Sequence, residues 1–442
     1  MGESAAKVAA IAIVLCAPAA GPLPNQTHAP LDEGREAIVP DSRRPTVVAA
    51  FTRESYRPGR VARLVFTDHV PAVTMQIYRA GTDSTPLRAN DVMRGTAVTE
   101  PVDLGPVERA SARKVAIGPW ASGVYFAKLT APGGRIGYAP FVLAPRVLGV
   151  HNVAVVIPTQ TWQAYNFRDC DGDGHGDTWY AGWNQRTARL GRPFLHRGTP
   201  PHWKSNDLPF LQWVEASGKT VDYLADSDLA STRTGARLRA AYSLVVFPSH
   251  EEYVTTREYD VVTAYRNRGG HLIFLSANNF FWRIVSHGNV MTRTRRWRDL
   301  GRPEAALSGV EYFRNDRGQR REPWVIRASP ANNWLLSGSG LAPGSRISSG
   351  GIEADRITTS SPRNITIVAQ IPNLYGPGLT PQMTYYETRR GARVFAAGAF
   401  GLTGAVVDPR VARLLANLWR RMADPPAAEK SLPDQPETLT AP

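Results

Sequence analysis

The sequence predicts an α/β protein in which an N-terminal β-sandwich is followed by a doubly wound, mostly parallel α/β domain. Short strand candidates separated by Gly and Pro fill residues 45–147, which is typical of a lectin- or Ig-like sandwich. Between residues 148 and 422, continuous apolar runs alternate with helix-like segments, the rhythm of a parallel sheet with helices on both faces. The length of 442 residues exceeds one ordinary core, so two or three domains are expected.

The first 20 residues predict a signal peptide. Lys7 precedes a short apolar run that ends in small residues, with an Ala-x-Ala pattern at Ala17 and Ala19. No later stretch reaches about 18 apolar residues, so no membrane span is expected. Cleavage would leave Cys170 as the only cysteine, which excludes an internal disulfide framework. We therefore expect a secreted or extracytoplasmic protein.

The composition is basic, with 52 Lys and Arg against 38 Asp and Glu and a formal net charge of +14. The basic residues are scattered, and the one local run spans residues 293–298. Scattered basic residues more often form a solvent-exposed surface than a nucleic-acid-binding surface. We expect no nucleic-acid partner, and a homo-oligomer stays open.

The N-terminal region begins with residues 21–44, whose Pro-rich, polar composition predicts a flexible lead. The segments that follow contain nothing that suggests catalysis. The candidate strands of the sandwich are residues 61–66, 72–80, 113–118, 123–131 and 136–144.

Beyond residue 148 the period of the apolar pattern changes. Two helix-like segments, 208–218 and 254–270, end in Gly, a common helix C-cap. Residues 303–360 are rich in Gly and Ser and predict an irregular excursion from the sheet, and residues 411–422 predict a closing amphipathic helix. The Pro- and Glu-rich residues 423–442 predict a disordered tail. The candidate strands are residues 153–157, 221–225, 244–247, 272–275, 365–370 and 392–398.

Polar side chains follow three of these strands where each strand ends. Ligands of open α/β sheets bind in the crevice beyond the carboxyl ends of the strands, so we expect these side chains to share one site. They are Tyr165 after residues 153–157, His250 and Glu252 after residues 244–247, and Asn278 and Asn279 after residues 272–275.

The same residues allow other interpretations. The His-Glu-Glu run fits a metal site, an acid/base pair or the solvated mouth of a loop. In an extended loop, the side chains of residues two positions apart point to the same side of the chain. His250 and Glu252 are therefore expected to face the crevice, and Glu251 is expected to face away from it. Tyr165 also fits a core aromatic residue, and Asn278 also fits a helix cap.

An acidic loop predicts a calcium site. Carboxylates stand at loop positions 1, 3, 5 and 9 in Asp169, Asp171, Asp173 and Asp177, and such a cluster repels itself unless a cation lies among its members. Tyr180 stands where an EF-hand carries its bidentate glutamate, so the loop is more similar to shorter extracellular calcium loops. The alternative is an acidic, Gly-rich turn.

Other catalytic motifs are absent from the sequence. It contains no Gly-x-Ser-x-Gly elbow, no Walker-type phosphate loop, no His-Glu-x-x-His motif and no Cys/His zinc spacing. These absences remove the common serine-hydrolase, nucleotide-binding and zinc-protease classes.

Several segments together resemble the large (beta) subunit of N,N-dimethylformamidase and its relatives. The α/β part carries TWQAYN at 161–166, PSHEEY at 248–253, SANNFFWR at 276–283 and GARVFAAGAF at 391–400. The β-rich part adds SYRPGR, IYRAG and SGVYFAKL, so the resemblance covers about residues 45–420.

The resemblance implies an amidohydrolase-like α/β domain with a mononuclear iron held by two tyrosines and one glutamate. Carried over by motif, the first tyrosine is Tyr165 and the glutamate is Glu252. His250 and Asn278 would line the same pocket, and a further family glutamate would fall on Glu387.

The second tyrosine has two candidate positions. The family's Arg-Pro-Tyr segment corresponds to a run that ends in Phe194, and phenylalanine cannot ligate a metal. Tyr180, after the acidic loop, is the alternative.

The function expected from these residues is hydrolysis of a C–N bond, an amide, with a metal-activated water as nucleophile. Glu252 would be a ligand, His250 would orient or shuttle a proton, and Asn278 would polarise the carbonyl. The expected cofactors are iron and calcium, and the expected partner is a small amide or a polymer substrate. The alternative is a non-catalytic extracellular protein that binds a carbohydrate or another polymer on a degenerate enzyme fold.

Overall fold

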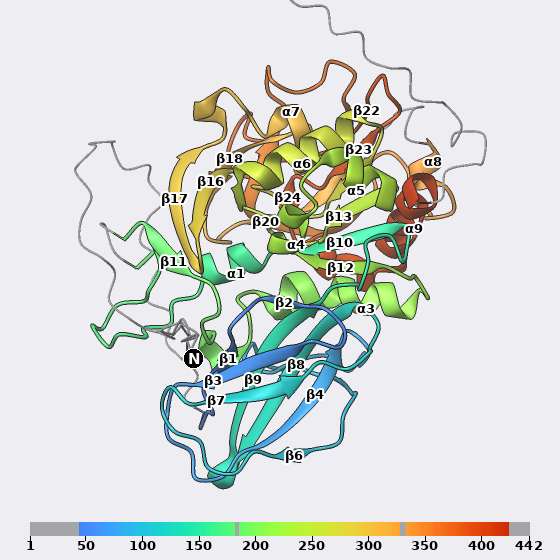
Figure 1. Cartoon of the computed structure of the whole chain (residues 1–442). Helices are drawn as coiled ribbons and strands as arrows, with labels where there is room; N and C mark the ends of the chain where they lie inside the picture. Colours follow the sequence, from blue (N-terminus) through green and yellow to red (C-terminus); the bar gives the residue numbers. More distant parts are fainter. Residues whose placement is uncertain (1–43, 182–184, 328–332, 424–442) are drawn as a thin grey trace, which may run out of the picture.

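The computed structural model describes residues 44–181, 185–327 and 333–423. The predicted signal peptide (1–20), lead (21–44) and tail (423–442) lie outside these ranges except for Arg44 and Ala423, so they stay predictions, as does the secreted location. The chain is of mixed α/β class, as predicted, with a β-rich N-terminal part below and a helix-covered sheet above in Figure 1.

Two sheets build the N-terminal part. Their side chains meet in one hydrophobic core, which Leu64 and Phe66 enter from one sheet and Tyr125 and Phe141 from the other. The first sheet has the order β1 (Ala49–Phe51), β3 (Val61–Phe66), β7 (Ala112–Ala116). The second has the order β2 (Ser55–Tyr56), β9 (Arg135–Leu143), β8 (Gly123–Ala131), β4 (Thr74–Ala80), β5 (Gly95–Ala97), with β6 (Val102–Asp103) on β4.

Five parallel strands form the first half of an 11-stranded sheet. Every residue of these strands is buried, because helices cover both faces, and this explains the continuous apolar runs of the sequence. Their order is β12 (Asp222–Ala225), β10 (Val153–Ile157), β13 (Leu244–Phe247), β15 (His271–Phe274), β23 (Arg393–Ala396).

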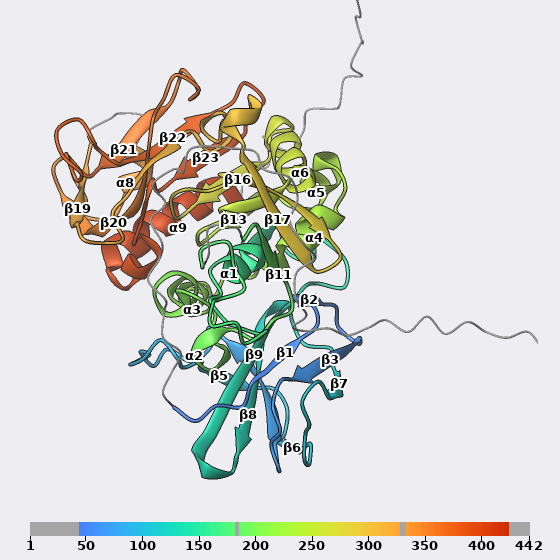
Figure 2. The same cartoon turned by 90° about the vertical axis from the view of Figure 1, so that its left-hand side faces the viewer.

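Alternate side chains of these strands enter different cores. Val155 and Val246 pack with α3 (Leu208–Ala216) and α9 (Pro409–Ala423), whereas Val156 and Val245 pack with the helices of the other face. Figure 2 shows the two helix layers on opposite sides of the sheet. The second layer consists of α4 (Asp226–Ser231), α5 (Gly235–Ala241) and α6 (Thr256–Asn267).

The second half of the large sheet is antiparallel, so the predicted mostly parallel sheet is wrong there. Residues 303–360 are also not irregular, since they contribute three strands to this half. Register shifts occur at three places in these strands. Each shift interrupts the alternation of apolar and polar residues by which a strand is recognised in a sequence. The strands are β22 (Gln382–Glu387), β21 (Thr366–Gln370), β19 (Arg321–Ile326), β20 (Arg346–Arg356), β18 (Glu311–Asn315) and β24 (Ala399–Phe400).

The connections that follow β10, β13 and β15 form a small four-stranded sheet. It encloses a separate core that includes Ala164, Trp179 and Tyr253. Its order is β11 (Thr187–Arg189), β17 (Val290–Arg296), β16 (Trp282–His287), β14 (Tyr253–Thr255). It therefore lies next to the residues that follow β10 and β13.

Short helices complete the fold. Within the described ranges no helix has the length and apolar character needed to cross a membrane. The short elements are α1 (Thr159–Ala164), α2 (Leu195–Gly198), α7 (Ala305–Ser308), α8 (Asn333–Leu336), the 3-10 turns Pro132–Gly134, Arg298–Leu300 and Thr403–Val407, and the π-helical turn Trp203–Asp207.

Candidate active site

Three neighbouring strands deliver polar side chains to one edge of the large sheet. β10 leads through α1 to Tyr165, β13 leads to His250 and Glu252, and β15 leads to Asn278. Because β10, β13 and β15 are parallel neighbours, their carboxyl ends lie at the same edge. A cavity lined by Tyr165, Glu252 and Asn278 opens at this edge.

Three oxygen atoms converge at the centre of the site. The Tyr165 hydroxyl donates to Glu252 Oε2 at 2.8 Å, and the Tyr180 hydroxyl lies 2.9 Å from the Tyr165 oxygen and 3.3 Å from the same carboxylate oxygen. The two tyrosine rings stack with their centroids 4.6 Å apart. The Tyr180 hydroxyl also bonds that of Tyr253, which begins β14. Tyr180, rather than Phe194, is thus the second tyrosine beside Glu252.

Phe194 has a structural place away from these oxygens. Its ring is buried and meets Trp162 edge to face at 6.1 Å. The family's Arg-Pro-Tyr motif corresponds to a run that ends in Phe194. In the structure, however, the loop that follows Tyr165 places Tyr180 beside Tyr165 and Glu252.

His250 connects the central oxygens to a second carboxylate. Its Nδ1 lies 3.0 Å from the carbonyl oxygen of Ala277, which can only accept, so Nδ1 is the donor. Its Nε2 lies 3.0 Å from Glu252 Oε2 and 3.5 Å from Glu353 Oε2. Burial alone lowers the pKa of His250, but the carboxylates of Glu353 and Glu252 outweigh it and raise that pKa to about 9.

Glu353 is the site residue that the sequence prediction missed. It comes from β20, in the segment predicted to be irregular, and burial raises its pKa to about 8. One signal was available, because Glu353 and Asp355 alternate with small or apolar residues and so share one side of a strand. Two carboxylates on the buried side of a strand are uncommon outside functional sites.

Asn278 occupies an uncommon backbone conformation, with φ of 53°. Its backbone NH donates to Asp355 Oδ1 at 2.9 Å, which holds the turn, and the side chain lines the cavity. Within the described residues, Asn278 Oδ1 and Glu353 Oε2 are buried and accept no hydrogen bond. Asn278 Oδ1 is therefore available to a bound group, whereas Glu353 Oε2 already lies 3.5 Å from His250 Nε2.

Backbone hydrogen bonds fix the loop that carries Glu252. Thr161 Oγ1 accepts from the backbone NH groups of Glu252 at 3.1 Å and Tyr253 at 3.4 Å. Asn279 Oδ1 accepts from the NH of Glu251 at 3.0 Å. The carboxylate of Glu252 is therefore positioned from α1 on one side and from the loop after β15 on the other.

Glu251 faces away from the crevice, and it does not reach solvent. Glu251 is only 1% exposed, because the loop directs its side chain into the protein interior, next to Asp226. Burial, followed by the charge of Asp226, raises the pKa of Glu251 well above its usual range. Sequence neighbours here belong to two separate polar clusters.

Glu387 is not among the side chains that meet at the site. It ends β22, which runs antiparallel to β23, and it pairs with Arg393 at the beginning of β23. It accepts a hydrogen bond from Tyr385 and lies 3.5 Å from Arg393 Nε. The antiparallel turn of the chain therefore places Glu387 at the opposite edge of the sheet, and Glu353 is the additional glutamate at the site.

A cavity of about 660 Å³ opens onto these residues. Tyr165, Tyr180, Glu252, Asn278 and Glu353 form part of its lining. The cavity is within the size range of small-molecule sites, and its polar groups converge at one end. The lining also includes Arg296, Arg298, Arg314, Arg317 and Arg356.

The acidic loop lies between Tyr165 and Tyr180 in the sequence. Asp169, Asp171 and Asp177 each offer an oxygen within 4.8 Å of the others, whereas Asp173 is outside this group. Asp173 Oδ1 instead accepts from the backbone NH of His175 at 2.8 Å. Three of the four predicted calcium ligands are thus close together, and exposed acidic groups of this kind are common without an ion.

The donors at the centre of the site fit a metal cation. Two phenol oxygens and a carboxylate oxygen are hard donors, and tyrosine and carboxylate oxygens are known iron ligands in proteins. Burial and the charge of Glu252 raise the pKa of Tyr165 well above its usual range, so a cation would be needed to favour its phenolate form. The three oxygens of Tyr165, Tyr180 and Glu252 therefore fit a hard cation, and iron at this site stays a prediction.

Comparison with known proteins identifies relatives. Residues 112–408 match the protein family described as N,N-dimethylformamidase beta subunit-like, C-terminal. The N,N-dimethylformamidase beta subunits of Paracoccus aminophilus and of Alcaligenes sp are each 23% identical over 324 residues. Each match covers 58% of this chain and 42% of the relative, so the chain corresponds to less than half the length of these proteins.

Solved structures show only weak similarity. A superoxide reductase (neelaredoxin) from Ignicoccus hospitalis matches 23% of this chain and 82% of its own with 13% identity and a TM-score of 0.16. A cycloisomaltooligosaccharide glucanotransferase from Paenibacillus sp. matches 80% of this chain and 69% of its own with 9% identity and a TM-score of 0.17. Scores this low carry no argument about fold or function.

Proposed function

Because the chain belongs to the N,N-dimethylformamidase beta subunit-like family, we propose that it is a hydrolase that cleaves the C–N bond of an amide. The observation that carries the proposal is the convergence of Tyr165, Tyr180 and Glu252 oxygens within 3.3 Å, next to His250. A buried set of hard donors beside a cavity is the arrangement expected of metal-assisted hydrolysis.

Tyr165, Tyr180 and Glu252 would hold an iron ion, which when bound supplies Lewis-acid chemistry to the amide carbonyl and to water. The stacked rings and the hydrogen bonds of Thr161 keep the three oxygens close together before the ion binds. Pre-positioned ligands reduce the ordering cost of binding.

The surrounding side chains would handle protons and orient the substrate. Water attacks the carbonyl carbon, the C–N bond breaks, and a proton must pass from the water to the departing nitrogen. His250 Nε2 lies between Glu252 and Glu353, so it is placed to pass that proton. Asn278 lines the cavity and can donate its side-chain NH to the carbonyl oxygen as negative charge develops there.

The finer division of the fold is also a proposal. Two sheets with one shared core support a β-sandwich domain at residues 45–147. Helices on both faces of the five parallel strands support a doubly wound domain at residues 148–422. Limited proteolysis should release fragments that begin near residue 148, and cleavage spread evenly over both regions would contradict this division.

The function is tested by metal analysis and by hydrolysis assays on the same preparation. Purified protein should contain about one iron per chain and should release amine from a panel of short N-alkyl formamides and acetamides. Removal of the iron with a chelator should abolish amine release, and added Fe²⁺ or Fe³⁺ should restore it. Protein that binds no transition metal and hydrolyses none of the amides would refute the proposal.

A further inference from the structure

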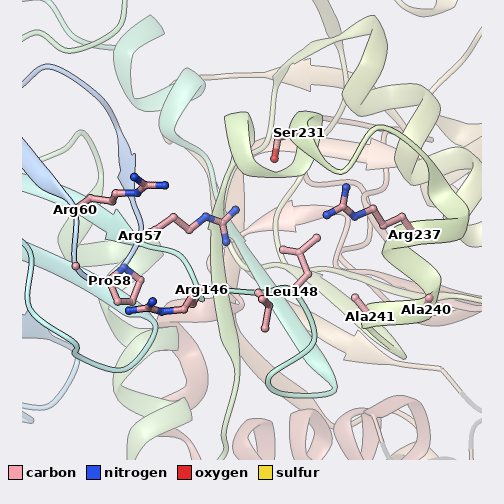
Figure 3. Close-up of a pocket in the computed structure, with 11 residues that line it drawn as sticks. Arg57, Pro58, Arg60, Arg146, Leu148, Ser231, Arg237, Ala240 and Ala241 are labelled. Carbon is pink, nitrogen blue, oxygen red and sulfur yellow. The ribbon is translucent and has the colours of Figure 1, made fainter.

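A second groove lies at the junction of the β-rich part and the α/β part. The turn after β2, the connection between β9 and β10, and α5 form its walls (Figure 3). Its volume is about 860 Å³, and its lining includes four arginines but no acidic residue. None of these lining residues belongs to the cavity of the candidate active site.

One of the four arginines is held by the protein itself. The Arg57 guanidinium pairs with Asp228 Oδ1 at 3.3 Å and donates to the carbonyl oxygen of Pro145. Ser55 Oγ donates to the other oxygen of Asp228 at 2.6 Å. These contacts tie the turn after β2 to α4 and to the connection after β9, so this part of the groove is positioned independently of any ligand.

The other three arginines have no such partner. Arg60, Arg146 and Arg237 are exposed, and no carboxylate in the described ranges forms an ion pair with any of them. Guanidinium groups are positively charged at neutral pH, so these three repel one another and Arg57. A chain with net charge +14 adds to the positive potential, and a concave surface focuses it.

The side chains are directed at a common volume. Figure 3 shows Arg57 and Arg237 pointing toward one another from opposite sides of the groove, with Arg60 entering from the same side as Arg57. Arg146 lies along the wall next to Gly59. Charges contributed by separate segments around one groove differ from the scattered basic residues of an ordinary solvated face.

We propose that this groove binds a ligand that carries at least two oxyanion groups of the phosphate or sulfate type. Each such group presents three or four acceptor oxygens, which match the forked donors of arginine, and its charge relieves the repulsion among the guanidinium groups. The four arginines come from three separate segments around a groove of about 860 Å³, which has room for more than one oxyanion group. The proposal does not depend on the proposed hydrolase activity.

The oxyanions have two possible sources, which the same experiment separates. Tripolyphosphate represents a free polyphosphorylated molecule, and a heparin tetrasaccharide represents sulfate esters on a polymer. Binding of each probe to the purified full chain is measured by isothermal titration calorimetry at about 150 mM salt, where nonspecific attraction between exposed charges is largely screened.

The test variant is Arg60→Ala/Arg146→Ala/Arg237→Ala. A matched control removes three exposed arginines elsewhere, Arg257→Ala/Arg413→Ala/Arg420→Ala, and gives the same net charge. We expect saturable 1:1 binding of at least one probe by the wild type, at least about tenfold weaker binding by the test variant, and unchanged binding by the control. The probe that binds identifies the source of the oxyanion.

Two results would overturn the proposal. One is the absence of saturable binding of both probes to the wild-type protein. The other is an equal loss of affinity in the test and control variants, because this would make the attraction a property of net charge. Unfolding curves check that both variants fold, and the single variants Arg60→Ala, Arg146→Ala and Arg237→Ala replace the triple variant if it does not.

Discussion

Tyr180 Oη lies 2.9 Å from Tyr165 Oη although an acidic loop separates the two residues in the sequence. This contact brings the second phenol to the carboxylate of Glu252 and completes a three-oxygen donor set. The position that matches the family motif, Phe194, is instead part of the core beside Trp162.

We expect Tyr180→Phe to lower iron content and amide hydrolysis by about 10- to 100-fold, because it removes one donor and keeps the ring stack. Tyr78→Phe is the matched control, since Tyr78 lies on β4 and its hydroxyl bonds Gln76. Iron content and initial rates are measured side by side. Full iron content in Tyr180→Phe would exclude Tyr180 as a ligand.

Glu252→Gln should reduce amide hydrolysis by at least about 100-fold and release the metal, because an amide is a weaker ligand than a carboxylate. Glu322→Gln, an exposed substitution on β19, is the control for the loss of one negative charge. The rates and the iron content of both variants are compared with wild type. Equal activity of the two variants would contradict the assigned site.

Glu251→Ala should lower the free energy of unfolding by about 2 kcal/mol, because it leaves a cavity in the buried cluster that Glu251 forms with Asp226. Glu322→Ala should change it by less than about 0.5 kcal/mol, as expected for an exposed position. Urea unfolding monitored by circular dichroism provides the comparison. A Glu251→Ala protein as stable as wild type would show that the cluster contributes little.

Calcium should raise the thermal midpoint of the wild-type protein if Asp169, Asp171 and Asp177 bind it, because a ligand of the folded state alone stabilises that state. At a hundredfold excess over Kd the gain is about 2.7 kcal/mol. Asp171→Asn/Asp177→Asn should remove the response, whereas Asp173→Asn should retain most of it. A wild-type midpoint that calcium does not change would reject the site.

Stability should fall as the pH rises from about 4 to 8. Burial raises the pKa of Asp207 to about 7 and of Glu258 to about 8, so the folded state keeps protons that the unfolded state has lost. The unfolded state then binds fewer protons, and each group lowers stability by up to about 1.4 kcal/mol per pH unit within this window.

Asp207→Asn tests the sign of this dependence. Asn cannot titrate and still accepts from Ser249, whose hydroxyl lies 2.6 Å from Asp207 Oδ1. The slope of unfolding free energy against pH should become shallower between pH 4 and 7, and the exposed control Asp260→Asn should leave it unchanged. A slope that does not change in Asp207→Asn would contradict the raised pKa.

The sequence by itself determined the mixed α/β class and the edge of the sheet where the polar residues gather. Buried parallel strands must be apolar throughout, so Val153–Ile157 and Leu244–Phe247 were recognisable, and parallel strands bring their carboxyl ends to one edge. Tyr165, His250, Glu252 and Asn278 could therefore be predicted from position alone. The motifs of the family carried the same information.

Only the tertiary structure decided which residues complete the site. Whether Tyr180 or Phe194 reaches Glu252 depends on the path of the loop between them, and no local pattern specifies that path. Glu353 approaches His250 because bulged antiparallel strands extend the sheet, and outside the Glu353–Asp355 stretch the bulges interrupt the alternation that marks a strand. Glu251 is buried because neighbouring residues of an extended segment point to opposite sides, and in this loop both sides are covered by protein.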